Sequence, residues 1–325
     1  MAIVSAIIPT WNRADLLRSI LENLQSQARK PDEVIVVDNG SSDDTPNVIR
    51  EFGVVSICFP ENRGFAVAVN EGISQAVGDW ILIVNNDVVL EDNWLEILLE
   101  SAEKENAAFA AGKLLRPKSQ ELDGSFDLVS RAAYAWRSGY GKPDSPLWSQ
   151  ARRIWFAPMT AALFKKLVFE QIGMLDTRFE SYYEDVDFGV RCAIAGLHGI
   201  YEPQAVARHM SKTTLGRSAA RVYYLTARNQ IFILARYLSA RTLLRFAWPI
   251  LAGQVLALLA AARQRNLFAA MRGKWVGLRR WKEFRASNDA AEAIFRQSER
   301  EIFELQKKAG FDIYWRLYFL LVRPG

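Results

Sequence analysis

Residues 81–90, ILIVNNDVVL, contain two amides and a carboxylate directly after a run of branched apolar side chains. The interior of a strand disfavours Asn and Asp, and an unpaired carboxylate is costly to bury. We therefore expect Asn85, Asn86 and Asp87 to lie where a strand leaves its sheet. Polar side chains at such an edge indicate a site that uses them.

Polar side chains also follow the three preceding segments that are predicted as strands. These polar clusters run from Thr10 to Arg13, from Asp38 to Ser42 and from Asn62 to Gly64. In open α/β sheets, ligands bind beyond the carboxyl ends of the strands. Because parallel strands end at the same edge of a sheet, four polar groups in these positions predict one common site.

His209 is one of two histidines in the chain and follows the strand-like segment GIYEPQAVA. A carboxylate and an imidazole suit Mn²⁺, whereas Mg²⁺ usually takes carboxylate and phosphate oxygens. Asp87 and His209 are therefore candidate ligands of one divalent cation, Mn²⁺ or Mg²⁺, whose coordination diphosphate oxygens and water would have to complete. Such a cation neutralises charge on a diphosphate leaving group. The plainer alternative is that His209 is a structural histidine.

The segment YYEDVDFGVRCAIAG predicts a helix that begins near Glu184 or Asp185. Carboxylates are favourable at a helix N-terminus because they face its free N–H groups. Asp185 is therefore either a reactive carboxylate or only a cap. Asp187 is expected to pair with Arg191, one helical turn later.

Strand and helix patterns alternate through the first half of the chain. The strand-like segments are 3–9, 32–39, 54–60 and 79–87, and the helical segments are 13–27, 41–52, 65–77 and 90–105. This alternation predicts an α/β fold with a mostly parallel sheet flanked by helices. The first segment lacks a basic region before it, so we expect a strand there and not a signal peptide.

Several classes of protein lose support from motifs that the chain lacks. No G-x-G-x-x-G or G-x-x-x-x-G-K-[ST] loop follows the first strand, which disfavours dinucleotide oxidoreductases and P-loop enzymes. Two cysteines do not make a disulfide framework. Residues 116–146 are rich in Gly, Ser, Pro and charge, and they predict a loop-rich insertion.

Charge is distributed unevenly along the chain, whose formal net charge is +5. Residues 1–240 carry 25 basic and 29 acidic side chains, whereas residues 241–325 carry 16 and 7. We therefore expect a body at 1–240 and a basic helical tail at 241–325. Such a tail suits an anionic membrane surface or nucleic acid. We expect no nucleic acid partner, because no recognised binding module surrounds the basic segment.

Residues 246–262 are uncharged and lie at the lower limit of length for a membrane span. A single span would export the basic segment that follows, against the positive-inside tendency. We therefore favour amphipathic helices that lie on the membrane, with Trp248, Trp275, Trp281 and Trp315 as anchors. The alternatives are a true span and a helical subdomain packed on the body or on another subunit of a homo-oligomer.

Seven stretches in a fixed order carry a resemblance to a known family. They are SAIIPTWNR, EVIVVDNGSSDDT, ENRGFAVAVNEGI, ILIVNNDVVLEDNWL, YYEDVDFGVRCAIAGL, VARHMSKTT and YYLTARNQIFIL. Together they span about residues 3–235 and resemble the family-2 glycosyltransferases of the Rossmann-like GT-A fold. The nearest likeness is to the bacterial branch that builds surface polysaccharides, with its rhamnosyltransferase-like members. Asn85 departs from the pattern, because many members carry the first acidic residue of a D-x-D motif there.

The resemblance implies roles for the candidate residues. Thr10 and Asp38 would contact the nucleotide base, Asp87 and His209 would hold the metal, and Asp185 would be the general base. The rest of the nucleotide-sugar site would be formed by Asn12, Arg13, Asn62, Gly64, Asn70, Asn85, Asn86 and Lys212, the last of these near the diphosphate.

The resemblance thus implies an inverting glycosyltransferase of cell-surface glycan synthesis. Its donor would be a UDP- or dTDP-linked sugar, with dTDP-rhamnose as one candidate, and its acceptor a hydroxyl of a lipid-linked or polysaccharide molecule. We expect it in the cytoplasm, peripheral on the inner membrane. The alternatives are a non-catalytic nucleotide-sugar-binding scaffold and a metal-dependent nucleotidyltransferase.

Overall fold

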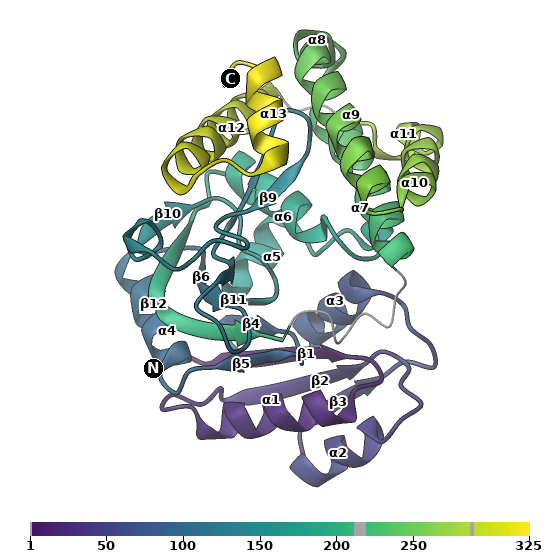
Figure 1. Cartoon of the computed structure of the whole chain (residues 1–325). Coiled ribbons are helices and arrows are strands. Elements are labelled where there is room, and N and C mark those ends of the chain that lie inside the picture. The colour runs from purple at the N-terminus through teal and green to yellow at the C-terminus, as the bar shows by residue number, and fades with distance from the viewer. Residues whose placement is uncertain (1, 211–218, 287–288) are drawn as a thin grey trace. The chain divides into compact units, whose positions relative to one another are not determined.

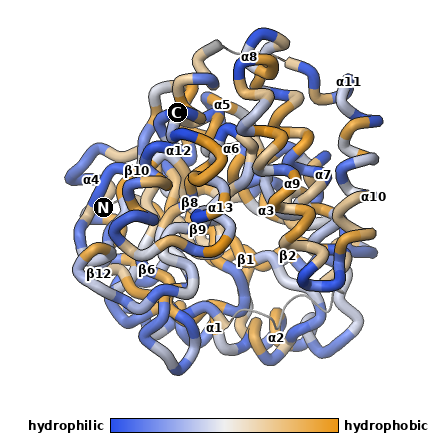
Figure 2. Tube along the Cα trace, turned by 45° about the horizontal axis from the view of Figure 1, so that its top comes forward, coloured by the Kyte–Doolittle hydropathy of each residue, from blue (hydrophilic) through white to orange (hydrophobic). Residues whose placement is uncertain are grey.

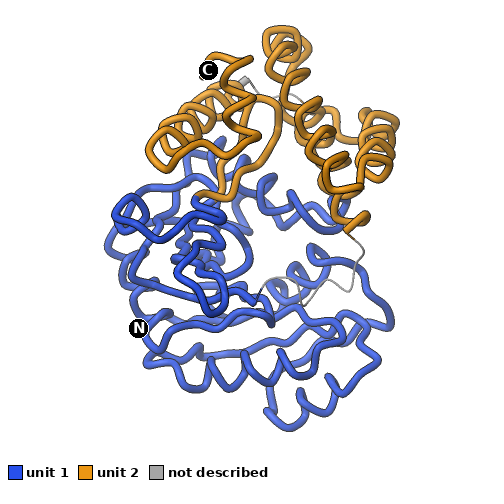
Figure 3. The backbone as a smooth tube through the Cα atoms, viewed as in Figure 1, with its two compact units in different colours: residues 1–126, 139–215 blue, residues 127–138, 216–325 orange. Residues whose placement is uncertain are grey.

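A computed structural model describes residues 2–210, 219–286 and 289–325 of the chain. The backbone divides into two compact units (Figure 3). Unit 1 comprises residues 1–126 and 139–215, and unit 2 comprises residues 127–138 and 216–325. A functional division at residue 240, which the charge distribution suggests, stays a prediction.

Unit 1 contains one large sheet (Figure 1). Its strands are β1 (Val4–Thr10), β2 (Glu33–Asp38), β3 (Val55–Cys58), β4 (Trp80–Val84), β5 (Val88–Leu90), β6 (Phe109–Leu115), β7 (Leu122–Gly124), β10 (Arg152–Ile154), β11 (Ala161–Lys165) and β12 (Gly199–His209). The main order is β10-β12-β6-β11-β4-β1-β2-β3, with β5 paired to β12 and β7 paired to β6. The pairs β12–β6, β4–β1, β1–β2 and β2–β3 are parallel, and β11 is antiparallel to both its neighbours.

Helices connect the strands of unit 1 as the alternation predicts. They are α1 (Ala14–Ser26), α2 (Thr45–Phe52), α3 (Phe65–Gln75), α4 (Trp94–Lys104), α5 (Lys166–Ile172) and α6 (Glu184–Ile194), with 3₁₀ turns at Pro146–Trp148 and Thr177–Phe179. The predicted α/β fold, a mostly parallel sheet flanked by helices, is confirmed.

Two predicted helices begin later than expected. The segment 41–52 becomes helical only at Thr45, because Ser41 and Ser42 bond the loop after β1. The segment 90–105 becomes helical at Trp94 and is preceded by β5. Three residues are too few to show a strand pattern, so the sequence alone did not indicate this strand.

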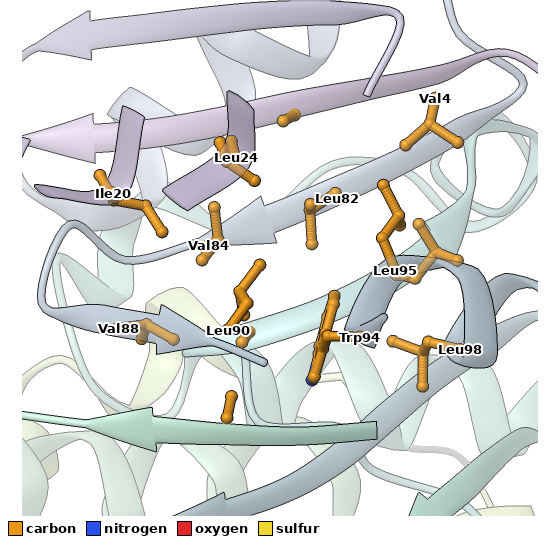
Figure 4. Packing of buried hydrophobic residues seen from close by; sticks show 14 of the residues in the cluster. Val4, Ile20, Leu24, Leu82, Val84, Val88, Leu90, Trp94, Leu95 and Leu98 are labelled. Carbon is orange, nitrogen blue, oxygen red and sulfur yellow. The ribbon is translucent and has the colours of Figure 1, made fainter. Parts of the chain in front are cut away.

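The main core of unit 1 lies between the sheet and the helices α1 and α4 (Figure 4). Ile20 and Leu24 are one turn apart on α1, and Trp94 and Leu98 are one turn apart on α4. This spacing places each pair on one face of its helix, where it packs against strand residues such as Val84. The core therefore fixes the strands whose carboxyl ends carry the polar residues.

Unit 2 is mainly helical. Its elements are the hairpin of β8 (Asp127–Val129) and β9 (Ala135–Arg137), followed by α7 (Ala219–Tyr237), α8 (Ala240–Arg245), α9 (Ala247–Arg263), α10 (Leu267–Arg279), α11 (Trp281–Phe284), α12 (Asp289–Ala309) and α13 (Ile313–Leu321). The predicted helical C-terminal region is confirmed. In the described ranges, no helix has the length and apolar character needed to cross a membrane.

The β8–β9 hairpin comes from the predicted loop-rich insertion and forms part of unit 2. The Arg131 guanidinium of this hairpin lies 2.5 Å from a carboxylate oxygen of Glu299 on α12, and both side chains are buried. The Tyr318 hydroxyl of α13 donates to the other Glu299 oxygen at 2.7 Å. The hairpin and the last two helices therefore share one buried polar network.

The four predicted membrane anchors differ in exposure. Trp315 is 2% exposed and packs against Tyr134 and Trp136 of the hairpin, so its prediction as a surface anchor is wrong. Trp248 and Trp275 are both 55% exposed. Trp281 is half-buried.

A substitution at Gly72 tests how closely α3 packs on the sheet. A Cβ at this position would lie 2.5 Å from Cγ2 of Ile7, so Gly72→Ala is expected to lower the free energy of unfolding by about 1–3 kcal/mol. Alanine is the better helix former, so an exposed site would show the opposite sign. Urea denaturation measures the change, and the exposed Ser74→Ala on the same helix should stay within about 0.5 kcal/mol of wild type. A more stable Gly72→Ala protein would contradict this account.

Candidate active site

The ends of β1, β2 and β4 bring the first polar residues together. Thr10 and Asp38 are register partners at the last positions of β1 and β2. The Asn86 amide, in the loop after β4, donates to the Thr10 hydroxyl at 2.9 Å. All three side chains are buried. The predicted gathering of these groups at one sheet edge is therefore observed.

The loop after β1 is tied to the loop after β2. The backbone N–H of Asn12 donates to the Ser41 hydroxyl at 2.8 Å, and the Asn12 side chain accepts from the Ser42 N–H at 2.7 Å. One carboxylate oxygen of Asp38 accepts from the Ser41 N–H at 2.9 Å. These bonds hold both loops in one conformation before any ligand binds.

The loop that carries Asn62 and Gly64 joins the same network. The Asn39 amide donates to the Gly64 carbonyl at 3.1 Å and accepts from the Arg63 N–H at 2.8 Å. Gly64 has φ +91°, and a Cβ there would lie 2.9 Å from the Glu180 carbonyl oxygen. Glycine thus lets this loop approach the turn that precedes α6.

Strained backbone precedes α6. Glu180, Tyr182 and Tyr183 have φ values of 64°, 67° and 70°, a region that non-glycine residues rarely adopt. Strain of this kind clusters at functional sites, where the surrounding structure enforces it. The turn orients the first residues of α6 close to the loop of Gly64.

Asp185 is the second residue of α6 and is half-buried. One of its carboxylate oxygens accepts from the Val186 N–H at 2.8 Å, which supports a capping contribution, although the N-cap position itself belongs to Tyr183. Asp187 and Arg191 form the predicted pair at 3.0 Å. Asp185 and Asp187 therefore have different environments on the same turn.

The pairing of β5 with β12 brings Asp87 to His209. His209 is the register partner of Val88, and the Met210 N–H donates to the Asp87 carbonyl at 2.8 Å. As a result, Nε2 of His209 lies 3.3 Å from a carboxylate oxygen of Asp87. The two residues that the sequence selected as metal ligands are thus in contact.

Asp123 on β7 completes this arrangement, and sequence reasoning missed it. Its carboxylate lies 2.6 Å from Nδ1 of His209. Burial by itself lowers the pKa of His209, but the hydrogen bonds with Asp123 and Asp87 outweigh it and raise the pKa to about 9. Asp123 sits in the loop-rich insertion, where no local sequence pattern distinguishes this buried carboxylate from those at the surface.

Two of the predicted residues, Asn70 and Arg13, also bond residues outside the predicted set. Both atoms of the Asn70 amide bond the backbone of Leu175, at 2.8 and 3.0 Å. Arg13 pairs with Asp15 at 2.8 Å. Asn85, by contrast, follows β4 directly and its N–H donates to the Thr160 carbonyl at 2.9 Å. Lys212 lies outside the described residues.

The pair of Asp87 and His209 fits a divalent cation. It offers one carboxylate and one imidazole, the donor types that suit Mn²⁺, and the negative field that holds a proton on His209 also favours a cation in its place. Asp123 bonds the opposite ring nitrogen, so it acts by orienting His209. Within the part of the chain that is described, no group of three or more acidic, His or Cys side chains is arranged to hold a metal.

Comparison with known proteins identifies the sequence pattern. The model of the family described as Glycosyl transferase family 2 matches residues 5–173, just over half of the chain. An N-acetylglucosaminyl-diphospho-decaprenol L-rhamnosyltransferase of Mycobacterium tuberculosis is 27% identical over 247 residues, which cover 67% of this chain and 79% of that protein. An O-antigen biosynthesis protein of Myxococcus xanthus is 28% identical over 218 residues, which cover 63% of this chain and 17% of that protein.

The fold is shared with solved structures. A mannosyltransferase from Pyrobaculum calidifontis, determined in complex with GDP-Man and Mn²⁺, superimposes with a TM-score of 0.54 at 18% identity. The superposition covers 98% of this chain and 86% of that protein. The expected GT-A architecture is confirmed by this likeness.

Removal of the Asp123 carboxylate should destabilise the protein. Asp123→Ala leaves Nδ1 of the buried His209 without its partner, so the free energy of unfolding should fall by about 1–3 kcal/mol. Asp123→Asn retains an acceptor and should lose less. Urea denaturation in the presence of a chelator gives the values, with the exposed Asp92→Ala as control. Equal stability of Asp123→Ala and Asp92→Ala would refute the contribution of this bond.

Proposed function

The chain belongs to glycosyl transferase family 2 in its surface-polysaccharide branch, and on this premise we propose an inverting sugar transfer from a UDP- or dTDP-linked donor. The acceptor is a hydroxyl of a lipid-linked or polysaccharide molecule. The observation that carries the proposal is the contact of Asp87 with His209 at the sheet edge that also holds Thr10 and Asp38.

The donor binds across the carboxyl ends of β1, β2 and β4. Thr10 and Asp38 face the base, and Asn12, Asn62 and the adjacent backbone shape its pocket. The network that links these loops supports this assignment, because a preorganised pocket loses little conformational entropy when a ligand binds. The rhamnosyltransferase name of the mycobacterial relative makes dTDP-rhamnose one donor to test.

Asp185 is proposed as the general base. A sugar hydroxyl is a poor nucleophile near neutral pH, and a carboxylate within hydrogen-bond reach takes its proton as it attacks. The hydroxyl oxygen forms a bond to the anomeric carbon from the face opposite the diphosphate. The bond between that carbon and the diphosphate oxygen breaks, and the nucleoside diphosphate leaves with the electron pair. One displacement from the opposite face inverts the anomeric centre.

Asp87 and His209 are proposed to hold a divalent cation, Mn²⁺ or Mg²⁺, which neutralises the charge that develops on the leaving diphosphate. Asp123 fixes the ring of His209 so that Nε2 faces Asp87. Asn85 contributes an amide in place of a carboxylate and adds no charge to this site. The proposed metal affinity is accordingly modest.

The proposed acceptor suggests where the protein acts. A lipid-linked acceptor is held at a membrane, so the catalytic body would work in the cytoplasm, peripheral on the inner membrane, with the basic helices of unit 2 in contact with lipid. The name of the mycobacterial relative, which includes a diphospho-decaprenol, supports an acceptor of this kind.

Two alternatives differ in observable chemistry. A non-catalytic scaffold would bind the nucleotide sugar without transfer. A nucleotidyltransferase would release pyrophosphate, and it would require a basic, glycine-rich loop after β1, where this chain has PTWNR. The presence of both Asp87 and Asp185 favours the transferase.

Calorimetry of nucleotide binding tests the donor site. UDP, dTDP and GDP are titrated with Mn²⁺, with Mg²⁺ and with chelator, and we expect one pyrimidine nucleotide to bind only with metal. Asp87→Ala should abolish the metal-dependent part, because the carboxylate ligand is lost. Asp123→Asn should weaken Mn²⁺ binding roughly 10- to 100-fold, the usual effect of a residue that orients a ligand. Binding that ignores both metal and Asp87 would overturn the metal assignment.

Turnover of Asp185→Asn tests the base. The amide preserves size and cannot accept the proton, so the rate should fall roughly 10²- to 10⁴-fold while nucleotide affinity and stability stay near wild type. Asp187→Asn serves as the comparison, since it breaks an ion pair and should act on stability first. A near-normal rate of Asp185→Asn would exclude it as the base.

A further inference from the structure

The positive charge of the tail is confined to one part of unit 2. Residues 241–285, which form α8 to α11, carry ten basic side chains and one acidic side chain. Residues 286–325, which form α12 and α13, carry six of each. The net charges of these two parts are therefore +9 and zero.

Helix α9 exposes a continuous apolar stripe. Trp248, Leu251, Val255 and Leu259 recur at helical spacing, and each is between 45% and 60% exposed. The opposite side of α9 packs inside unit 2, where a Cβ at Gly253 would lie 2.4 Å from the Ala132 methyl group of the hairpin. Figure 2 shows α9 as a largely hydrophobic segment of the trace.

Helix α10 exposes a second stripe. Phe268, Met271, Trp275 and Leu278 are between 54% and 81% exposed. The opposite face packs closely on α7, because a Cβ at Gly273 would lie only 2.2 Å from the Tyr224 carbonyl oxygen. The apolar side chains of α10 that point away from α7 are thus left uncovered in unit 2.

The two stripes lie on the same side of the α9–α10 pair. Only the turn at residues 264–266 separates the helices, and so short a connection makes them an antiparallel pair. Lys274 of α10 bonds Gln254 of α9 across their contact. Viewed from the N-terminus of each helix, the exposed side chains of α9 are rotated from Gln254 in one direction around the helix axis. The exposed side chains of α10 are rotated from Lys274 in the same direction. Because the two helices run in opposite directions, rotation in the same direction from their contact places both stripes on one face of the pair.

Basic side chains border this face. Arg263, Arg265, Arg272, Arg279 and Lys282 are exposed, and across the described ranges none of these five forms an ion pair. Arg279 lies 4.6 Å from the ring centre of Trp275. An apolar face with Trp, bordered by cations that have no carboxylate partner in the described ranges, matches an anionic lipid surface, in which apolar groups enter the acyl boundary and cations meet the headgroups.

We propose that the α9–α10 face, which includes the exposed Phe268 and Trp275, docks on an anionic lipid bilayer, and that α12 does not. The inference rests on the proposed function only in one respect: docking on a membrane would bring the enzyme to a lipid-linked acceptor. Charge distinguishes this face from the remaining helices, because α12 and α13 are neutral together and their buried groups belong to the network of Arg131 and Glu299.

Vesicle flotation of the full chain tests the proposal. Wild type should bind vesicles of phosphatidylcholine with 30% phosphatidylglycerol. Its binding to vesicles of pure phosphatidylcholine, or to the mixed vesicles in high salt, should be roughly tenfold weaker. Arg272→Glu/Arg279→Glu should weaken binding roughly 10- to 100-fold. Lys307→Glu/Lys308→Glu makes the same charge change on exposed residues of α12 and should stay within about twofold, since two charges outside the face add little.

The apolar part of the face has its own pair of variants. Phe268→Ser/Trp275→Ser should weaken vesicle binding at least about tenfold, whereas Val77→Ser/Leu167→Ser removes comparably exposed side chains from unit 1 and should not. Circular dichroism establishes that each variant is folded. The proposal would be overturned if all variants bound vesicles equally or if wild type did not bind. It would also be overturned if sedimentation showed a dimer that Phe268→Ser/Trp275→Ser abolishes, because the face would then belong to a contact with a second copy.

A transfer assay with a water-soluble acceptor separates this inference from the proposed function. The α9–α10 variants should retain transfer, because none of the substituted residues belongs to the proposed donor or catalytic set. Vesicle binding that depends on the face, in a protein without transfer activity, would refute the proposed function and leave the docking surface standing.

Discussion

The candidate site depends on the antiparallel pairing of the three-residue strand β5 with the end of β12. This register places Asp87 beside His209 and bonds the Met210 N–H to the Asp87 carbonyl. A shift by one residue would turn the side chains of β5 to the other face of the sheet. Val88 and Leu90 on β5 are buried in the main core, so the core that stabilises unit 1 also fixes the geometry of the two charged groups.

His209 lies between two carboxylates, which compensate for the energetic cost of partly burying a charged ring. Burial disfavours charge on the ring, yet Asp123 and Asp87 more than compensate and raise its pKa to about 9. A site that stabilises a proton in this way is preorganised for positive charge, and the proposed divalent cation would take the place of that proton. The Thr10–Asn86 bond and the tied loops extend this preorganisation to the neighbouring residues of the proposed donor pocket.

The helices of unit 2 fall into two groups, one that packs around a buried ion pair and one that exposes an apolar and basic face. The hairpin inserted from residues 127–138, together with α12 and α13, buries the Arg131–Glu299 pair, and a buried pair of this kind needs both partners present. Helices α9 and α10 use their small residues against the hairpin and α7, and they leave large apolar side chains and arginines outside. The excess charge of the tail therefore lies on the helices with the uncovered face.

Four features could be predicted from the sequence: the α/β alternation, the polar groups at the strand ends, the helix that begins near Asp185 and the family. These features follow from local patterns of period 2 and 3.6 and from short motifs, which need no knowledge of distant contacts. Tertiary structure alone decided the strand β5, the partner of His209 and the burial of Trp315. In the sequence Asp123 looks like an ordinary surface carboxylate and Trp315 like a membrane anchor, because the contacts that bury them come from side chains far away along the chain. Long-range pairing selects such partners, and no local pattern carries that information.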